Sequence, residues 1–281
     1  YEVASMTRQV FHERVTLAFQ DHVAEVALAR PREHNGLDWG MMDGLLEAQQ
    51  RLRELDGLRA VVLSGTGESF CAGLDMAAIM TRPERLPLLL APDEQGINPV
   101  QRLALGWRDV GVPVIAALHG HVYGGGLQIA LGADIRVAHP RVRLALLEIL
   151  WGIIPDMGIS VTGASIRSDV LRELAWTGRK VSGGEAVSLG LATRLDDDPQ
   201  RAARDIAIEV AARSPKAVAA ARELFSRTPG MSERERLALE ASLQRGLLGG
   251  EEQLEAVAAR MAGREPRFAG PCRPDGEPNG G

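Results

Sequence analysis

Residues 110–133 contain no Asp, Glu, Lys or Arg, and this uncharged stretch constrains the fold more than any other feature of the chain. It is long enough to span a bilayer. However, it also contains a proline, two histidines, a glutamine and six glycines, a composition typical of a buried strand, a turn and a buried helix. We therefore expect a strand at 112–120, a helix from Leu127 and no membrane span.

Three consecutive glycines, Gly124, Gly125 and Gly126, stand where that strand meets the helix. They allow a reacting oxygen to approach main-chain N–H groups, and the helix dipole adds partial positive charge there. A lone Glu148 follows in the apolar segment ALLEILWGIIPDMG. Glycines also serve helix–strand packing or a phosphate cradle, but no Gly-x-Gly-x-x-Gly or Walker-type sequence accompanies these. The arrangement favours a site that stabilises a negatively charged oxygen.

Strand and helix patterns alternate along the first part of the chain. Residues 15–29 show two alternating runs around a turn, the pattern of a hairpin, and residues 41–55 have helical spacing after a candidate N-cap, Asp38. Apolar runs at 59–65 and 112–120 indicate buried strands. This order predicts an α/β core with crossover connections. The Pro- and Leu-rich residues 81–99 have no clear period, so we expect a mobile loop beside the substrate.

The composition changes after Leu195. Ala, Arg, Glu and Leu at helical spacing follow the sequence Asp-Asp-Asp-Pro-Gln and continue to Pro266. Just before this boundary, residues 181–195 predict a short helix and then a strand. We thus predict a core over 7–195, a helical C-terminal part over 196–268 and a disordered tail over 269–281.

Charge patterning argues against nucleic acid as a partner. The net charge is −5, and basic and acidic residues are interleaved without the basic stripe that such binding requires. Two cysteines, Cys71 and Cys272, lie far apart in the sequence and belong to no paired framework. We therefore expect a cytoplasmic protein.

Five motifs follow one another along the chain: RPREHNGLD, SGTGESFCAGLDM, HGHVYGGGLQIALGADIRVA, LLEILWGIIPDMG and AGREPRF. In this order they resemble the crotonase superfamily, the enoyl-CoA hydratases and isomerases, from about Val15 to Phe268. The resemblance implies a crotonase-like spiral of repeated ββα units. It also implies a C-terminal helical segment used in assembly, as a homotrimer or dimer of trimers. The substrate would be an acyl-CoA thioester, with coenzyme A as part of the substrate and no separate cofactor.

The resemblance places an oxyanion hole on the main-chain N–H groups of Leu74 and Gly125. Family hydratases use two glutamates, whereas this chain has Gln128 and Glu148 at those positions. An amide can orient water but cannot accept a proton at neutral pH. One carboxylate is enough for isomerisation, so we expect Glu148 to shuttle a proton during double-bond isomerisation of an enoyl-CoA. A hydratase with altered water activation, a hydrolase or decarboxylase variant, and a non-catalytic acyl-CoA binding protein remain as alternatives.

Two residues that follow Glu148 have more than one interpretation. Asp156 stands where hydratases commonly have glycine, and family members that isomerise 3,5-dienoyl thioesters resemble this chain in having an aspartate there. It could equally N-cap a helix that begins at Met157. Trp151 could face the acyl pocket, but we expect it in the core. If Glu148 is not a surface residue, its apolar neighbours predict a raised pKa for its carboxyl.

Two histidines two residues apart, His119 and His121, would face the same side of a strand. No metal-binding motif accompanies them, so we expect packing or hydrogen-bonding roles and no metal site.

Binding of coenzyme A would involve both ends of the chain. The resemblance implies contacts to the adenine end from the backbone of Ala72 and Leu74, and a phosphate contact from Arg32. It also implies that Arg264 and Phe268 lie near the coenzyme A of a neighbouring subunit.

Overall fold

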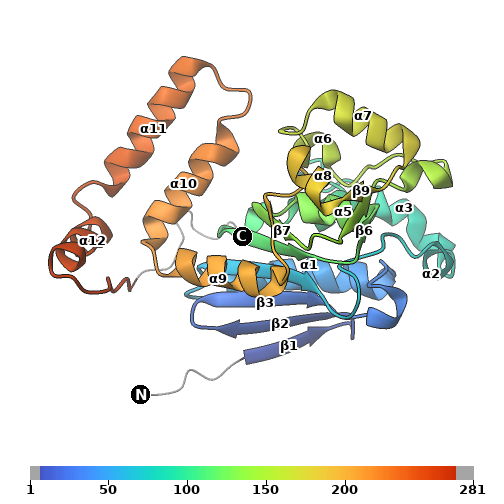
Figure 1. Ribbon diagram of the computed structural model, residues 1–281, viewed down its shortest axis with the longest axis horizontal. Helices are drawn as coiled ribbons and strands as arrows, with labels where there is room; N and C mark the ends of the chain where they lie inside the picture. The colour runs from blue at the N-terminus through green and yellow to red at the C-terminus, as the bar shows by residue number, and fades with distance from the viewer. Residues whose placement is uncertain (1–6, 270–281) are drawn as a thin grey trace.

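The computed structural model describes residues 7–269 of the 281-residue chain. Two sheets form its centre (Figure 1). The larger sheet has the order β1-β2-β3-β4-β5-β7-β10 and the smaller one the order β6-β8-β9. The tail predicted at 269–281 lies outside the described residues except for Ala269.

The strands are short and lie mostly in the first two thirds of the chain. Those of the larger sheet are β1 (Thr7–Phe11), β2 (Val15–Gln20), β3 (Val23–Leu28), β4 (Ala60–Gly65), β5 (Val114–Leu118), β7 (Ile135–Ala138) and β10 (Arg194–Leu195). Those of the smaller sheet are β6 (His121–Tyr123), β8 (Arg143–Ala145) and β9 (Val181–Ser182).

The helices cover the sheets and form the C-terminal part. The α-helices are α1 (Trp39–Glu54), α2 (Met76–Ile79), α3 (Leu86–Leu89), α4 (Pro99–Leu105), α5 (Gly125–Leu131), α6 (Ile159–Thr162), α7 (Ser168–Thr177), α8 (Gly183–Ser188), α9 (Pro199–Ala211), α10 (Pro215–Arg227), α11 (Glu233–Leu247) and α12 (Glu251–Met261). Four 3-10 helices accompany them: η1 (Pro31–Glu33), η2 (Pro83–Arg85), η3 (Arg108–Val110) and η4 (Glu148–Trp151).

The larger sheet changes from antiparallel to parallel at β3. The strands β1, β2 and β3 pair antiparallel, which confirms the hairpin predicted at 15–29. The pairs β3–β4, β4–β5, β5–β7 and β7–β10 are parallel, and crossovers connect such strands. Every residue of β4 is buried, as a strand covered on both faces requires. The α/β core with crossover connections is confirmed.

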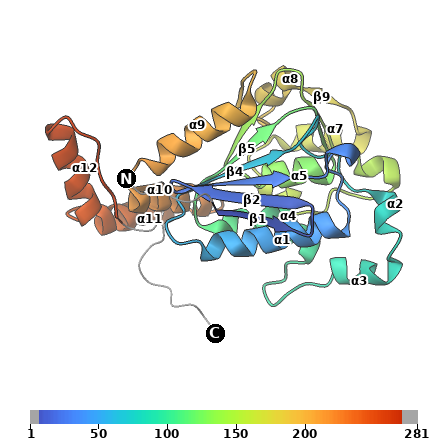
Figure 2. The same ribbon diagram turned by 90° about the horizontal axis from the view of Figure 1, so that it is seen from below.

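Helices cover both faces of this sheet (Figure 2). On one face, α1 begins after Asp38, whose side chain accepts a hydrogen bond from the amide of Met41 at 2.7 Å, so the predicted N-cap is confirmed. On the other face lies α9, which buries a row of alanines against Val62, Ile115 and neighbouring side chains. Alanines let helix and sheet approach closely. Although α9 falls in the predicted C-terminal part, it packs as a core helix.

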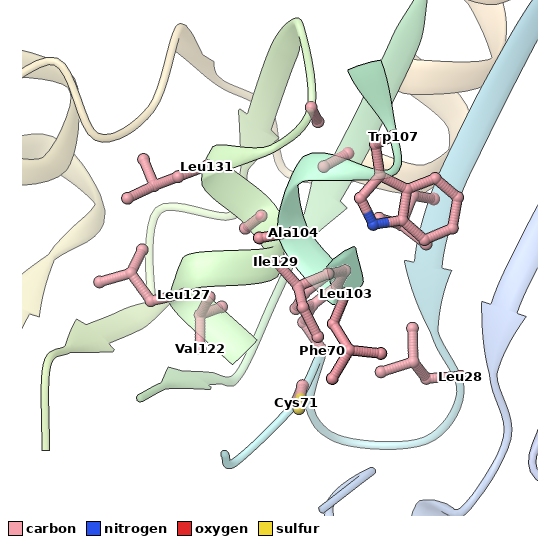
Figure 3. Packing of buried hydrophobic residues seen from close by; sticks show 14 of the residues in the cluster. Leu28, Phe70, Cys71, Leu103, Ala104, Trp107, Val122, Leu127, Ile129 and Leu131 are labelled. Carbon is pink, nitrogen blue, oxygen red and sulfur yellow. The ribbon is translucent and has the colours of Figure 1, made fainter. Parts of the chain in front are cut away.

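The smaller sheet packs into the main hydrophobic core, because its buried Val122, Leu144 and Val181 lie in one cluster with Cys71 and with side chains of α1 and β4. Isolated bridges join Cys71 to Val122 and Leu37 to Leu74. Figure 3 shows Val122 beside Leu127, and Cys71 follows Phe70 in the same cluster. The uncharged stretch thus forms β5, β6 and α5, which confirms the predicted strand, turn and helix. Within residues 7–269, no helix combines the length and apolar character needed to cross a bilayer.

Two peripheral segments complete the chain. Residues 81–99, expected as a loop, contain η2, α3 and the start of α4. At the other end, α10 and α11 project from the body of the protein, and α12 lies beyond them (Figure 1). These three helices bury only Pro215 and Ala259. Their apolar side chains therefore contribute little to the core of this chain.

Replacing Gly126 by alanine should destabilise the fold. The added Cβ would lie 2.4 Å from the carbonyl oxygen of Cys71 and 2.8 Å from its Cβ. The backbone of Cys71 cannot yield easily, because its N–H and C=O bond to His121 and Tyr123. We expect a loss of about 1–3 kcal/mol in the free energy of unfolding, measured by chemical denaturation.

Gly184→Ala is the matched control, because Gly184 lies in α8 and a Cβ there meets no atom within 4 Å. This variant should gain up to about 1 kcal/mol from helix propensity. Equal stability of Gly126→Ala and the wild type would contradict the close packing described above.

Candidate active site

Glu148 is the first residue of η4 and follows β8 after the buried Leu146 and the half-buried Leu147. Its side chain is buried, with 8% of the residue exposed. One carboxylate oxygen, Oε1, accepts a hydrogen bond of 2.6 Å from Nε2 of Gln128. Within the described chain, the other oxygen, Oε2, is buried and has no hydrogen-bond partner. Because buried polar atoms are nearly always paired, this oxygen marks a position where a reacting proton could be accepted.

The carboxyl of Glu148 has a pKa above its ordinary value of 4.5. Burial is the main cause, since it disfavours the charged form. Hydrogen bonds, including that from Gln128, act in the opposite direction, and the negative charge of Asp156 adds a further upward shift of the pKa. The raised pKa predicted from the sequence is confirmed in direction.

Gln128 has a fixed orientation. Its Oε1 accepts a hydrogen bond from the amide of Met157 at 2.8 Å, so its Nε2 must be the atom that faces Glu148. The residue is 1% exposed and lies on α5. Sequence reasoning singled out Gln128 but missed the Met157 amide that orients it. Backbone donors leave no residue-type signal, which explains the omission.

The two amides named for the oxyanion hole lie on chain segments that approach closely. Gly73 has φ of +92°, and a Cβ there would meet the carbonyl oxygen of Tyr123 at 2.8 Å and Cα of Gly124 at 3.6 Å. Within residues 7–269, neither the amide of Leu74 nor that of Gly125 donates a hydrogen bond to the protein. A Cβ at Gly124 would face the Glu148 carboxylate at 3.4 Å. The structure thus gathers both amides and the carboxylate around the glycines.

Asp156 lies in the loop between η4 and α6. The helix cap suggested for it is wrong, because the nearest helix, α6, begins at Ile159 with Gly158 as its N-cap. Asp156 is exposed overall, yet the protein around its carboxyl desolvates it enough to raise its pKa. It also raises the pKa of Glu148 through its charge. Asp156 therefore lies within electrostatic reach of the buried carboxylate.

Trp151 does not occupy the core. The residue is 62% exposed, and Leu150 and Ile154 nearby are 69% and 72% exposed. The prediction of a core position is therefore wrong. An apolar run does not reveal which of its side chains are buried in a short 3-10 helix, and here the last two residues of η4 are largely exposed.

The residues predicted to bind coenzyme A lie in two separate regions of the chain, one around η1 and one after α12. Arg32 is an exposed residue of η1, and two residues after it the carbonyl of His34 accepts a hydrogen bond of 2.9 Å from the amide of Ala72. Arg264 and Phe268 follow α12 at the other end of the chain (Figure 1). Arg264 forms a bidentate ion pair with Glu255, at 2.6 and 2.8 Å. A contact of these two residues with the coenzyme A of a neighbouring subunit stays a prediction.

Both histidines of the charge-free stretch are hydrogen-bonded. Nε2 of His119 contacts the carbonyl of Gly67 at 3.0 Å, and Nδ1 of His121 contacts Oγ of Ser69 at 3.1 Å. The hydrogen-bonding role predicted for them is confirmed. In the part of the chain that the structure describes, no group of three or more His, Cys, Asp or Glu side chains is arranged to hold a metal ion.

Comparisons with known proteins identify the family. Residues 18–271 match the enoyl-CoA hydratase/isomerase family. The chain is 33% identical over 213 residues to (E)-benzylidenesuccinyl-CoA hydratase of Thauera aromatica, covering 74% of this chain and 80% of that protein. It is 30% identical over 266 residues to carnitinyl-CoA dehydratase of Proteus mirabilis, covering 90% and 97% of the two chains.

The fold also matches solved structures. The crystal structure of an enoyl-CoA hydratase from Polaromonas sp. JS666 superimposes with a TM-score of 0.81 at 25% identity, covering 91% of this chain and 99% of that one. The expected crotonase fold is confirmed. With its glycine-lined amides and buried glutamate at the motifs that carry the resemblance, the chain belongs to the enoyl-CoA hydratase/isomerase family, whose members are enzymes.

Proposed function

We propose that this enzyme isomerises the double bond of an enoyl-CoA thioester, with Glu148 as the proton shuttle. One observation carries the proposal: a single buried carboxylate, with an unpartnered oxygen, faces an amide rather than a second carboxylate. Isomerisation requires one group that removes a proton at one carbon and returns it at another. Glu148 can do both at a pH near its raised pKa.

In the proposed reaction, the thioester oxygen lies between the amides of Leu74 and Gly125. Glu148 takes a proton from Cα of a 3-enoyl thioester, and the electron pair of the C–H bond delocalises onto the thioester oxygen as a dienolate. The protonated Glu148 then gives the same proton to Cγ, so that a 2-enoyl thioester forms without loss of atoms. Each amide would stabilise the negative oxygen by about 2.7–4 kcal/mol, the usual contribution of one such donor.

Hydration by Glu148 alone is the second candidate, and the names of two relatives favour it. One is a hydratase and the other a dehydratase. In this chain, however, Gln128 uses Nε2 on Glu148 and Oε1 on Met157, and an amide accepts no proton. Hydration would therefore need Glu148 to activate water and a separate source of the α-proton. A protein that only binds acyl-CoA remains the third candidate.

We further propose that the helical C-terminal part joins copies of this chain into trimers or dimers of trimers, in the cytoplasm. The exposed apolar side chains of α10–α12 support assembly: Phe225, Leu248 and Met261 are 75%, 62% and 85% exposed. Large exposed apolar surface marks interaction sites in soluble proteins. In such an assembly, Arg264 and Phe268 could reach the coenzyme A of a neighbouring subunit.

Glu148→Gln should abolish most isomerase activity. Purified enzyme is given 2-enoyl-, 3-enoyl- and 3,5-dienoyl-CoA, and the absorbance of the conjugated thioester is followed. Loss of a positioned acid–base group should lower kcat by about 10²–10⁴-fold. If wild type and variant are equally inactive on all three thioesters but still bind them, the enzyme does not isomerise, and the binding-protein candidate stands.

The pH profile tests the charge environment of the same residue. Catalysis needs ionised Glu148, so kcat/KM should rise with pH, with an acid limb above the ordinary glutamate pKa of 4.5. Asp156→Asn removes the negative charge that raises the pKa of Glu148, so the limb should move to lower pH. An unchanged limb would show that Asp156 does not act on Glu148 in the enzyme.

Gln128→Glu should increase hydration of a 2-enoyl-CoA. The new carboxylate keeps the hydrogen bond from the Met157 amide and supplies the second acid–base group. A gain of about 10²-fold or more is expected from such a group, measured as loss of the conjugated absorbance and identification of the 3-hydroxy product. Gln128→Met, which adds no base, is the control. Equal hydration by both variants would mean that the pocket, and not a missing carboxylate, limits hydration.

Phe225→Glu should weaken assembly. A charge at this exposed apolar position opposes burial against another copy. Light scattering after gel filtration should show a trimeric or hexameric wild type and smaller species for the variant. Ser226→Glu adds the same charge at the adjacent exposed residue and serves as the control. A monomeric wild type would contradict the proposed assembly.

A further inference from the structure

The outer face of the smaller sheet carries a row of cationic and aromatic side chains outside the candidate active site. His34, His121, Tyr123 and Lys180 follow one another in this order, and we call them the cationic row. Ring centroids of His34 and His121 are 5.3 Å apart, and those of His121 and Tyr123 are 5.0 Å apart. Nζ of Lys180 lies 5.4 Å from the Tyr123 ring centroid.

Strand register explains why these residues share one face. His121 pairs with Arg143 and Tyr123 with Ala145, while Arg143 in turn pairs with Ser182 on β9. Side chains alternate along a strand, so Lys180 and Ser182 lie on the same face as His121 and Tyr123. The residues between them, Val122, Leu144 and Val181, are fully buried on the other face. The smaller sheet is therefore apolar on one face and carries basic and aromatic side chains on the other.

Ser69 holds the two histidines in place. Its fully buried hydroxyl lies 3.1 Å from Nδ1 of His34 and 3.1 Å from Nδ1 of His121. Burial prevents Ser69 from acting as a nucleophile on a substrate. Within residues 7–269, no hydrogen bond involves Nε2 of either ring, and both histidines are partly exposed. Two Nε2 atoms thus face a ligand, and both donate when the imidazoles are protonated, as an anion favours.

The backbone at His34 has an unusual conformation that side-chain hydrogen bonds hold in place. His34 and Asn35 both have positive φ, 48° and 56°, a conformation that non-glycine residues rarely adopt. The buried Asn35 side chain holds the turn, because its Nδ2 donates to the carbonyls of Thr66 and Ser69. Strained residues held by surrounding structure are frequent at ligand sites.

We propose that His34, His121 and Lys180 form a phosphate-binding site. Three cationic or ionisable donors lie in one row, and Arg143 adds a fourth positive charge on the same face. Burial is the main cause of the lowered pKa of His121; the positive charges of His34 and Lys180 lower this pKa further, and Glu68 raises it. A phosphate ester offers three acceptor oxygens and up to two negative charges, which would relieve this repulsion.

The phosphate belongs either to the nucleotide end of the thioester substrate or to a separate phosphorylated molecule. The first source rests on the proposed function. It is favoured by position, because the amide of Ala72, a predicted coenzyme A contact, bonds to the carbonyl of His34. The row is also connected to the candidate active site, since Tyr123 directly precedes Gly124.

Direct binding of phosphate tests the site without reference to catalysis. Lys180 and Lys216 are the only lysines of the chain, so reductive 13C-methylation labels two side chains, and Lys216 serves as the reference in NMR spectra. Inorganic phosphate and 3′,5′-adenosine diphosphate should shift the signals of Lys180 and His34 and raise the pKa of His121, because an anion favours the charged imidazole. The remote His12 and His22 should not respond.

Kinetics then distinguish the two sources. Lys180→Gln should raise KM for a CoA thioester about threefold to tenfold with kcat unchanged, the loss expected for one exposed charge contact. KM for the matching pantetheine thioester, which lacks the nucleotide, should not change. Arg8→Gln removes one positive charge on β1, at the far edge of the larger sheet, and is the control.

Each outcome is informative. Phosphate-induced shifts together with the KM effect support binding of the nucleotide end. Shifts without a KM effect support the site with a separate phosphorylated ligand. No response of Lys180, His34 or His121 to phosphate or to the nucleotide overturns the proposal, whether or not the enzyme isomerises enoyl-CoA.

Discussion

The candidate active site depends on the approach of two backbone segments to distances that side chains would forbid. Residues 71–74 run beside residues 122–126, joined by the bridge between Cys71 and Val122. Added Cβ atoms at Gly73 and Gly126 would lie 2.8 and 2.4 Å from carbonyl oxygens of the other segment. A glycine loses more conformational entropy on folding than other residues do. These glycines nevertheless let main-chain donors from two segments meet at one point.

The side-chain amide of Gln128, which has a fixed orientation, determines how the site can exchange protons. Two carboxylates at the 2.6 Å that separates Nε2 of Gln128 from Oε1 of Glu148 could not both be ionised, so a glutamate at position 128 would share a proton with Glu148. With glutamine there, Glu148 is the buried acid–base group of the described site. Its pKa is raised mainly by burial and also by the charge of Asp156, and is lowered by hydrogen bonds that include the one from Gln128. Because the Met157 amide prevents the glutamine from turning, this donor cannot become an acceptor.

Residue patterns predicted the elements that local physics determines. The hairpin at 15–29, the cap at Asp38 and the strand–turn–helix of the uncharged stretch depend on neighbours in sequence, and all are confirmed. The core position predicted for Trp151 and the helix cap suggested for Asp156 were wrong. The environments of both residues depend on the path of the chain after Glu148, where η4 ends and α6 begins only at Ile159. His34 and Ser69, thirty-five residues apart, meet only through tertiary structure. No local pattern could have joined them.

Large apolar side chains are exposed on the surface near Glu148 and on the C-terminal helices. Leu150, Trp151 and Ile154 follow the glutamate and are all more than half exposed, while α10–α12 bury almost nothing within this chain. Both surfaces would lose water if another copy covered them. Asp156 lies in the same exposed loop and already raises the pKa of Glu148. Excluding water there would strengthen this repulsion and the desolvation of the carboxyl. An assembly in which another copy covers this loop would therefore raise the pKa of Glu148 further and couple the proton-shuttle chemistry to the oligomeric state.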